Sequence, residues 1–205
     1  MNFRTQVELP EKETEIRHSE QILLFGSCFA ENIGNLLKEN KFRCDVNPFG
    51  VLYNPLSIVC ALNQILERKE YREEDLFFSG GLWHSWMHHS DFSASSSEEC
   101  LERINSRLRK ASEELVTADW LVMTWGTSYV YMHEDMQMVV GNCHKQPDKT
   151  FRRSRQNASV FVEECLDVGN PSHGQCIQAG GIVRTYPRGC GFYVFEITYV
   201  PVLLR

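Results

Sequence analysis

Two short apolar runs, each followed by a glycine, stand out in the pattern of hydrophobic and polar positions. Residues 22–25 are apolar and lead into Gly26, and the largely apolar residues 121–125 lead into Gly126. Runs of this length that break at a glycine are typical of buried strands. The carboxyl ends of such strands meet at one edge of an open parallel sheet. We therefore predict that both runs are parallel, central strands of one sheet, with the two glycines at the same edge.

The pattern changes to a helical period directly after the first glycine. Ser27 is the natural N-cap, and Cys28 is the first helical residue. The apolar positions that follow are spaced for one face of an amphipathic helix: Phe29, Ile33, Leu36 and Leu37. The stretch thus predicts a buried strand that turns sharply into an amphipathic helix.

Further elements can be placed along the chain. Residues 42–46 predict a second short strand, and Asn54 with Pro55 predicts the start of a helix. We predict that this helix has one mainly apolar face, formed by Leu56, Val59, Cys60, Asn63 and Leu66. Residues 76–78 and 82–87 predict a hairpin, and a serine cluster precedes a long helix over residues 98–116. This order predicts an α/β layer.

Composition limits the class of protein. The 205 residues carry a formal net charge of −6, which disfavours binding to nucleic acid or to an anionic membrane. The amino-terminal residues are polar and no apolar run approaches membrane-spanning length, so we expect a soluble, cytoplasmic protein. Its length favours a single domain, and its eight cysteines are expected to stay reduced. We predict no cofactor, because the first glycine lacks the further glycines of a dinucleotide-binding loop.

Cys28 is the residue in the first turn with the most reactive side chain. A thiol at the start of a helix lies beside unpaired backbone N–H groups and the positive end of the helix dipole, which favours the thiolate. Cys28 is therefore a candidate nucleophile. The alternative is a small buried cysteine in a tight turn between strand and helix.

Residues 26–34, GSCFAENIG, are similar to the signature of the GSCFA-domain family, whose members resemble the SGNH/GDSL hydrolases. Further blocks that match are residues 47–50 with 53–55, 83–90, 126–127 with 130–131, and 142–145 with 147. The resemblance covers residues 1–153 and depends on several spaced blocks, which is more specific than one motif. It implies a three-layer, flavodoxin-like α/β fold with a parallel sheet that is incomplete at its carboxyl-terminal end.

The resemblance implies a role for each matching residue. Cys28 takes the position of the nucleophile, where the related hydrolases have serine, and Ser27 takes that of the preceding aspartate. Gly50 and Gly126 fall at positions that serve the oxyanion. Ser128 stands where those enzymes have an asparagine donor, so the hydroxyl of Thr127 or Ser128 is expected to replace it.

The resemblance also calls for a histidine base, normally found in a carboxyl-terminal Asp-x-x-His block, which this chain lacks. His144 is the best remaining candidate for the base, and its alternative is a purely structural role. Asn142 and His89, in two of the matching blocks, are expected to contact substrate. His84, His88 and His89 lie close in sequence, but no carboxylate or cysteine recurs with them at ligand spacing, so we predict no metal site.

The chain changes character after Arg153. Residues 154–205 contain no lysine and are rich in glycine, and we interpret them as an atypical tail that arose by frame shift or truncation, the alternative being a divergent but native terminus. Two functions therefore stay open. One is an SGNH-like hydrolase or acyltransferase that acts on an ester, an acylated carbohydrate or an acyl thioester. The other is a catalytically impaired fragment or binding module that keeps the pocket.

Overall fold

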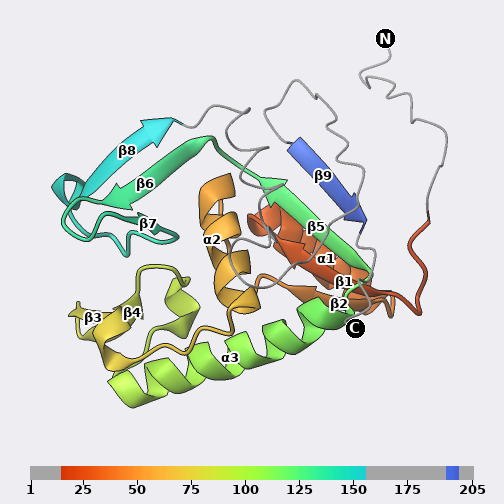
Figure 1. Cartoon of the computed structure of the whole chain (residues 1–205), viewed down its shortest axis with the longest axis horizontal. Coiled ribbons are helices and arrows are strands. Elements are labelled where there is room, and N and C mark those ends of the chain that lie inside the picture. The colour runs from red at the N-terminus through yellow and green to blue at the C-terminus, as the bar shows by residue number, and fades with distance from the viewer. Residues whose placement is uncertain (1–14, 156–192, 199–205) are drawn as a thin grey trace, which may run out of the picture.

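The main sheet has four strands among the residues that the structure describes. The structure is a computed structural model that describes residues 15–155 and 193–198. The strands lie in the order β2 (Arg43–Val46), β1 (Gln21–Phe25), β5 (Trp120–Trp125) and β9 (Tyr193–Thr198). Strand β1 pairs in parallel with both β2 and β5 (Figure 1). All five residues of β1 are buried, as expected for a strand that is covered on both faces. The prediction of two central, parallel strands is confirmed.

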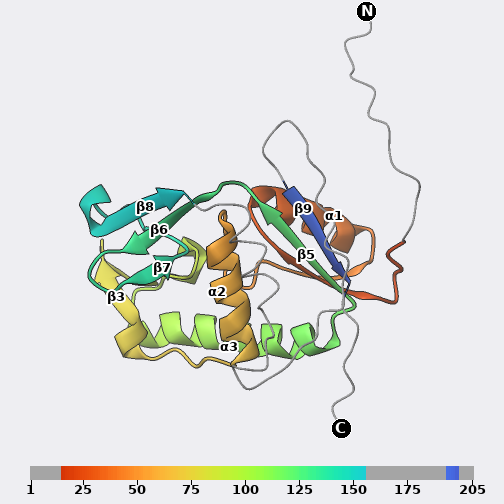
Figure 2. The same cartoon turned by 45° about the horizontal axis from the view of Figure 1, so that its top comes forward.

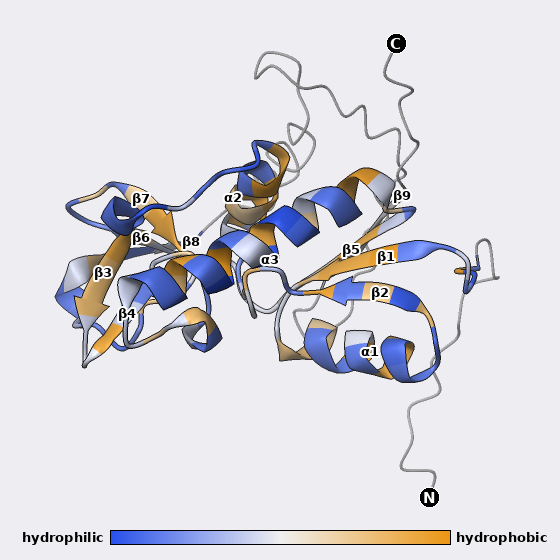
Figure 3. Cartoon of the chain, turned by 90° about the horizontal axis from the view of Figure 1, so that it is seen from below, coloured by the Kyte–Doolittle hydropathy of each residue, from blue (hydrophilic) through white to orange (hydrophobic). Residues whose placement is uncertain are grey.

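In the described part of the chain, three α-helices cover the sheet, and each begins at a polar cap. They are α1 (Cys28–Glu39), α2 (Pro55–Leu66) and α3 (Ser97–Thr117). Their N-cap residues Ser27, Asn54 and Ser96 each accept a backbone N–H bond from the first turn, as predicted for the first two. Helix α1 lies on one side of the sheet and α3 on the other, so the chain forms three layers (Figure 3). Within the described residues, no helix combines the length and the apolar character needed to cross a membrane.

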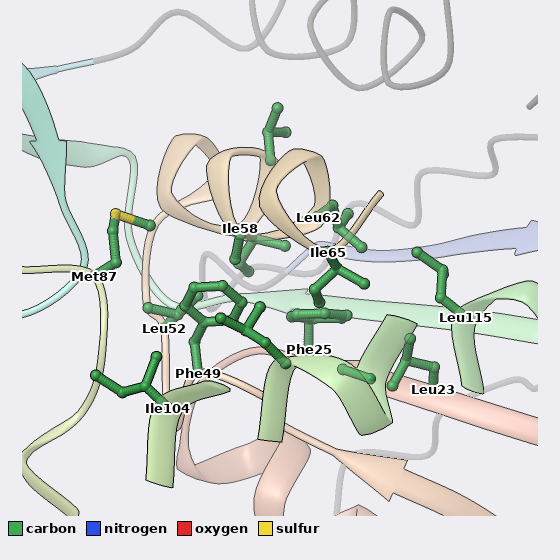
Figure 4. Close-up of a cluster of buried hydrophobic side chains, with 14 of the residues drawn as sticks. Leu23, Phe25, Phe49, Leu52, Ile58, Leu62, Ile65, Met87, Ile104 and Leu115 are labelled. Atoms are coloured by element: carbon green, nitrogen blue, oxygen red, sulfur yellow. The ribbon is translucent and has the colours of Figure 1, made fainter. Parts of the chain in front are cut away.

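The larger core lies between the sheet and helices α2 and α3. Leu23 and Phe25 of β1 point into it, and they meet Ile58, Leu62 and Ile65 of α2 (Figure 4). Helix α3 contributes its stripe of Cys100, Ile104, Leu108, Ala111 and Leu115. Each large apolar side chain buried here contributes about 1.5–3 kcal/mol to the free energy of folding.

The predicted face of α2 is wrong in part. Of the predicted residues only Val59 is buried, and Asn63 is exposed. The buried residues are Pro55, Ser57, Ile58, Val59, Ala61, Leu62 and Ile65. This helix carries apolar residues on most of its circumference, so its sequence does not select a single face. Packing against β1 and α3 makes that choice.

The face of the sheet under α1 is covered less completely. Ala30 and Gly34 are the buried residues of α1, and Leu37 packs against a small cluster formed around Ile22 and Leu24. Phe29, Ile33 and Leu36 are 49%, 37% and 54% exposed, although their spacing predicted a buried face. The helix forms where predicted, but it contacts the sheet through its small residues.

An ion pair fixes α3 to the end of β2. Arg107 Nη2 donates to both carboxylate oxygens of Asp45, at 2.9 and 2.7 Å, and to the carbonyl oxygen of Val46 at 3.2 Å. Asp45 is buried, so this charge-assisted contact is shielded from water. The contact holds the last residues of β2 in place immediately before the loop at residues 47–50.

Smaller β elements lie beyond the carboxyl ends of the parallel strands. The hairpin of β3 (Leu76–Ser79) and β4 (Leu82–Ser85) is confirmed. Strand β5 continues into a three-stranded antiparallel sheet of β6 (Tyr129–His133), β7 (Met138–Val140) and β8 (Phe151–Arg155), ordered β7-β6-β8 (Figure 2). The 3-10 turns η1 (Glu73–Asp75), η2 (Ser90–Phe92) and η3 (Asp148–Thr150) connect these elements.

Strand β9 corrects the prediction of a parallel sheet. It pairs antiparallel with β5 from Trp120 opposite Thr198 to Trp125 opposite Tyr193, so the sheet is mixed. The interpretation of residues 154–205 as an atypical tail otherwise falls on residues 156–192 and 199–205, which lie outside the described part of the chain.

Candidate active site

The turn from β1 into α1 is built around Gly26. Its φ is +152°, a conformation that favours glycine, and a Cβ added there would lie 2.1 Å from Thr124 Oγ1. The backbone N–H of Gly26 donates to Asn47 Oδ1 at 2.9 Å. The strand β1 can therefore turn directly into the helix, which places Ser27 and Cys28 at the carboxyl edge of the sheet.

Ser27 and Cys28 differ in access. Ser27 is 4% exposed, and its Oγ accepts the N–H of Phe29 at 3.3 Å as the helix cap. Cys28 is exposed and its thiol is free. The side chain that can meet a ligand at the start of α1 is therefore the thiol, and the alternative of a buried turn cysteine is wrong.

The loop after β5 lies against this turn. The N–H groups of Gly126 and Thr127 both donate to the carbonyl oxygen of Tyr53, at 2.9 and 3.2 Å. A Cβ added at Gly126 would lie 3.8 Å from the Cβ of Ser27. The predicted meeting of the two glycine turns at one edge is confirmed. Both N–H groups are already paired, and Thr127 Oγ1 accepts the N–H of Tyr129 at 3.1 Å.

Gly50 and His89 also meet. A Cβ added at Gly50, whose φ is +77°, would lie 2.2 Å from the Cβ of His89. The N–H of Gly50 donates to the carbonyl oxygen of Asn47 at 2.8 Å, so this donor is occupied in a turn. His89 Nδ1 lies 3.0 Å from Asp91 Oδ2, which orients the ring. The structure thus places the half-buried imidazole of His89, paired with the carboxylate of Asp91, beside the loop that holds Gly26.

His144 lies in a different environment. Its Nε2 donates to the carbonyl oxygen of Ser85 at 2.9 Å, and its backbone N–H donates to Asn142 Oδ1 at 2.9 Å. Its ring is 4.5 Å from that of His84. Burial lowers the pKa of His144, and its Nδ1 has no hydrogen-bond partner among the described residues. Within that part of the chain, no hydrogen bond joins His144 or Asn142 to Cys28.

The other histidines have partners of their own. His84 Nδ1 lies 2.6 Å from Ser93 Oγ. His88 is fully enclosed, stacks on Phe49 at 4.3 Å between ring centroids, and has its pKa lowered to about 3 by burial. No group of three potential metal ligands occurs within residues 15–155 and 193–198. His88 is therefore a packing residue of the core, and the half-buried His84 is held by Ser93 and by the carbonyl oxygen of Ser79.

Asn47 is the residue that the sequence analysis missed. Its N–H donates to the carbonyl oxygen of Leu24, its Oδ1 accepts from Gly26, and its φ is +47°. Its Nδ2 is buried and has no partner among the described residues. An asparagine tolerates this left-handed conformation better than most residues. The asparagine that opens the loop at residues 47–50 was the available signal, because it directly follows a predicted strand.

A sequence model of the GSCFA family matches residues 21–169 of the chain, which includes every element of this site. The chain belongs to the GSCFA family. The GSCFA match continues beyond Arg153, where we placed the end of the resemblance. Comparisons with curated proteins and with solved structures give no match.

Proposed function

We propose that this GSCFA protein is a hydrolase or acyltransferase of the SGNH type, in which the thiol of Cys28 attacks the carbonyl carbon of an ester or acyl thioester. The observation that carries the proposal is the exposure of Cys28 as the first residue of α1, at the edge where β1 and β5 both end in glycine turns. Ligands of α/β proteins bind at such an edge.

The nucleophile is Cys28 rather than Ser27. The hydroxyl of Ser27 is buried and engaged as the helix cap, so removing it from that bond would weaken α1. The thiol of Cys28 has no such structural task. Attack by its thiolate would break the ester or thioester bond, release the alcohol or thiol of the substrate and leave an acyl-enzyme, whose acyl group is then transferred to water or a second acceptor.

His89 is a better base than His144 in this proposal. A base needs a free ring nitrogen and a partner that orients the ring. In His89 the carboxylate of Asp91 accepts from Nδ1–H and leaves Nε2 as the acceptor, and His89 borders the loop whose Asn47 holds Gly26. In His144 the free nitrogen is Nδ1, which is buried.

The oxyanion requires donors that are not already paired. The N–H groups of Gly50, Gly126 and Thr127 donate within the protein, so they do not meet this condition. The Thr127 hydroxyl uses its oxygen as an acceptor and keeps its own proton for a ligand. The exposed Ser128 hydroxyl is a second side-chain donor on this loop, whereas the Asn47 amide nitrogen is buried.

A catalytically impaired chain or a binding module is the second candidate function. The sequence contains no Asp-x-x-His block, which is the observation that favours it. Such a protein would keep an accessible Cys28 but would show no turnover.

The accessibility of Cys28 can be tested by alkylation. Burial raises the pKa of Cys44 to about 11, and it also raises those of Cys100 and Cys143. Iodoacetamide at neutral pH should label Cys28 before Cys44, Cys100 and Cys143 in the folded protein, as measured by peptide mass spectrometry over time, because Cys28 is exposed and burial raises the pKa of the other three thiols. Labelling of Cys100 before Cys28 would contradict the proposed nucleophile.

Turnover separates the two candidate functions. With p-nitrophenyl acetate and an acyl thioester as substrates, Cys28→Ser should abolish activity. His89→Gln should reduce kcat by about 10²–10⁴-fold, the usual contribution of a general base. His18→Gln, an exposed histidine near Phe42, is the control and should leave activity unchanged. No turnover by the wild-type chain, with rapid labelling of Cys28, would support the binding module instead.

A further inference from the structure

One face of the sheet β7-β6-β8 carries both aromatic and basic side chains. Tyr129 lies opposite Arg155 and Tyr131 lies opposite Arg153 in the antiparallel pairing of β6 and β8. Directly opposite residues project from the same face of a sheet, so these four side chains form one strip, here called the Tyr–Arg strip. The guanidinium carbon of Arg153 is 3.7 Å from the ring centroid of Tyr129 and 6.0 Å from that of Tyr131.

The strip concentrates positive charge on an acidic protein. The whole chain has a formal net charge of −6, yet strand β8 carries three arginines in five residues. Arg153 and Arg155 are both exposed, and neither forms an ion pair with a carboxylate among the described residues. Tyr129 is 38% exposed. Within the described residues, no carboxylate therefore competes with an anion for these two guanidinium groups.

The strip lies close to the candidate active site. Tyr129 follows Gly126 by three residues, which span at most about 11 Å. Arg155 lies across the pairing from Tyr129, at about 5 Å between Cα atoms. Gly126 itself lies against Ser27, the neighbour of Cys28. A substrate bound at Cys28 could therefore extend a distal anionic part onto the strip.

We propose that the Tyr–Arg strip binds the diphosphate of a nucleotide-bearing acyl thioester, the donor in an acyl transfer to Cys28. This inference rests on the proposed function. The two arginines are two residues apart on β8, at a spacing of about 7 Å, so together they face a group that carries more than one negative charge. Arg153 covers one face of the Tyr129 ring, and the 38% of this residue that stays exposed adds an aromatic surface against which a planar base can pack.

Direct binding to the full chain tests the strip. Isothermal titration calorimetry with ADP at low ionic strength should give one saturable site. Arg153→Gln and Arg155→Gln should each raise the Kd by about tenfold, because each removes one charge-assisted contact. The matched control is Arg152→Gln, on the same strand but on the opposite face, where Arg152 contacts Met132 Sδ at 3.8 Å. It should change the Kd by about twofold or less.

Two further ligands define what the strip recognises. Inorganic pyrophosphate should compete with ADP, and Tyr129→Ala should weaken ADP more than pyrophosphate, because only ADP has a base to stack. Absence of saturable ADP binding, or equal effects of all three arginine variants, would overturn the proposal. Tighter binding of a single-stranded oligonucleotide than of ADP would also overturn it, in favour of nucleic acid.

The proposed binding at the Tyr–Arg strip and the proposed role of Cys28 can be tested independently. Cys28→Ser should bind ADP as the wild type does, while Arg153→Gln should leave the rate of Cys28 alkylation unchanged. ADP binding without turnover would support the strip and reject the enzyme. Turnover without ADP binding would reject the strip and support an ester substrate that lacks a nucleotide.

Discussion

The two faces of the main sheet are covered to very different degrees. On the face of α2 and α3, Leu23, Phe25 and Ile65 have no measurable exposure and belong to one continuous core. On the face of α1, the buried cluster is small, and three large apolar side chains of the helix remain exposed. The well-packed face also holds His88 and the buried Asp45, which contacts α3, whereas the thinly packed face carries Cys28.

One face of the sheet supports the two glycine turns, and the other leaves the thiol of Cys28 at the surface. The packed face fixes the directions of β1 and β5, and these directions bring the two glycine turns together. Helix α1 contacts the sheet through Ala30 and Gly34, so its first turn stays at the surface with the thiol of Cys28. The role proposed for Cys28 needs a rigid support and access to solvent, and the two faces supply these separately.

The largest expected effect is on the free energy of unfolding, when a side chain of similar size is truncated on each face of the sheet. Ile65→Ala should lower the free energy of unfolding by about 2–5 kcal/mol, because it leaves a cavity in the core. Leu36→Ala, at a residue 54% exposed, should change it by about 0.5 kcal/mol or less. Urea unfolding followed by circular dichroism measures both. A large loss for Leu36→Ala would mean that the α1 face is covered in solution.

The second prediction uses pH to probe the packed face. Burial lowers the pKa of His88 from 6.5 to about 3, so the unfolded chain takes up this proton at a higher pH than the folded one. Its contribution to stability is complete above pH 6.5 and is lost as the pH falls from there towards 3. At about pH 5 the loss should be about 2 kcal/mol.

Thermal or urea unfolding between pH 7 and pH 5 measures this loss. His88→Phe should remove most of the dependence, since phenylalanine can keep the stacking on Phe49. The lowered pKa of His144 leaves a smaller dependence of the same sign. An unchanged slope in His88→Phe would show that His88 takes up its proton normally in the folded protein.

The smallest effect concerns the cap of α1 on the thinly packed face. Ser27→Ala should lower the free energy of unfolding by about 1 kcal/mol, because the N–H of Phe29 loses its acceptor. Ser95→Ala, at an exposed serine beside the cap of α3, is the control and should have little effect. Loss of enzymatic activity in Ser27→Ala at unchanged stability would instead identify Ser27 as the nucleophile.

The boundaries of the main elements could be predicted because local signals determine them. The strand β1, the caps of α1 and α2 and the hairpin of β3 and β4 follow from short apolar runs, Ser27, Asn54, Pro55 and glycine turns. Each of these features acts within a few residues along the chain, so one sequence is enough to recognise it. The pairing of the two glycine turns followed from the edge rule for parallel strands.

The site was predictable in outline but not in its details. The structure brings Gly126 beside Ser27, as the two apolar runs predicted, and Gly50 beside His89. The sequence could not show which backbone N–H donors are already paired. The N–H group of Gly50 donates to the carbonyl oxygen of Asn47, and that of Gly126 donates to the carbonyl oxygen of Tyr53. His144 was a candidate by sequence, but its hydrogen bond to Ser85 is a contact between residues far apart in sequence.

The sequence by itself determined the sharp strand-to-helix turn, the position of the thiol at the first residue of α1 and the family of the chain. Only the tertiary structure decided which face of α2 is buried, that α1 rests on its small residues, and that β9 adds to β5 in the antiparallel direction. The physical reason is the range of the interactions. Caps and turns are satisfied locally, whereas burial and strand pairing depend on partners that the chain brings together only when it folds.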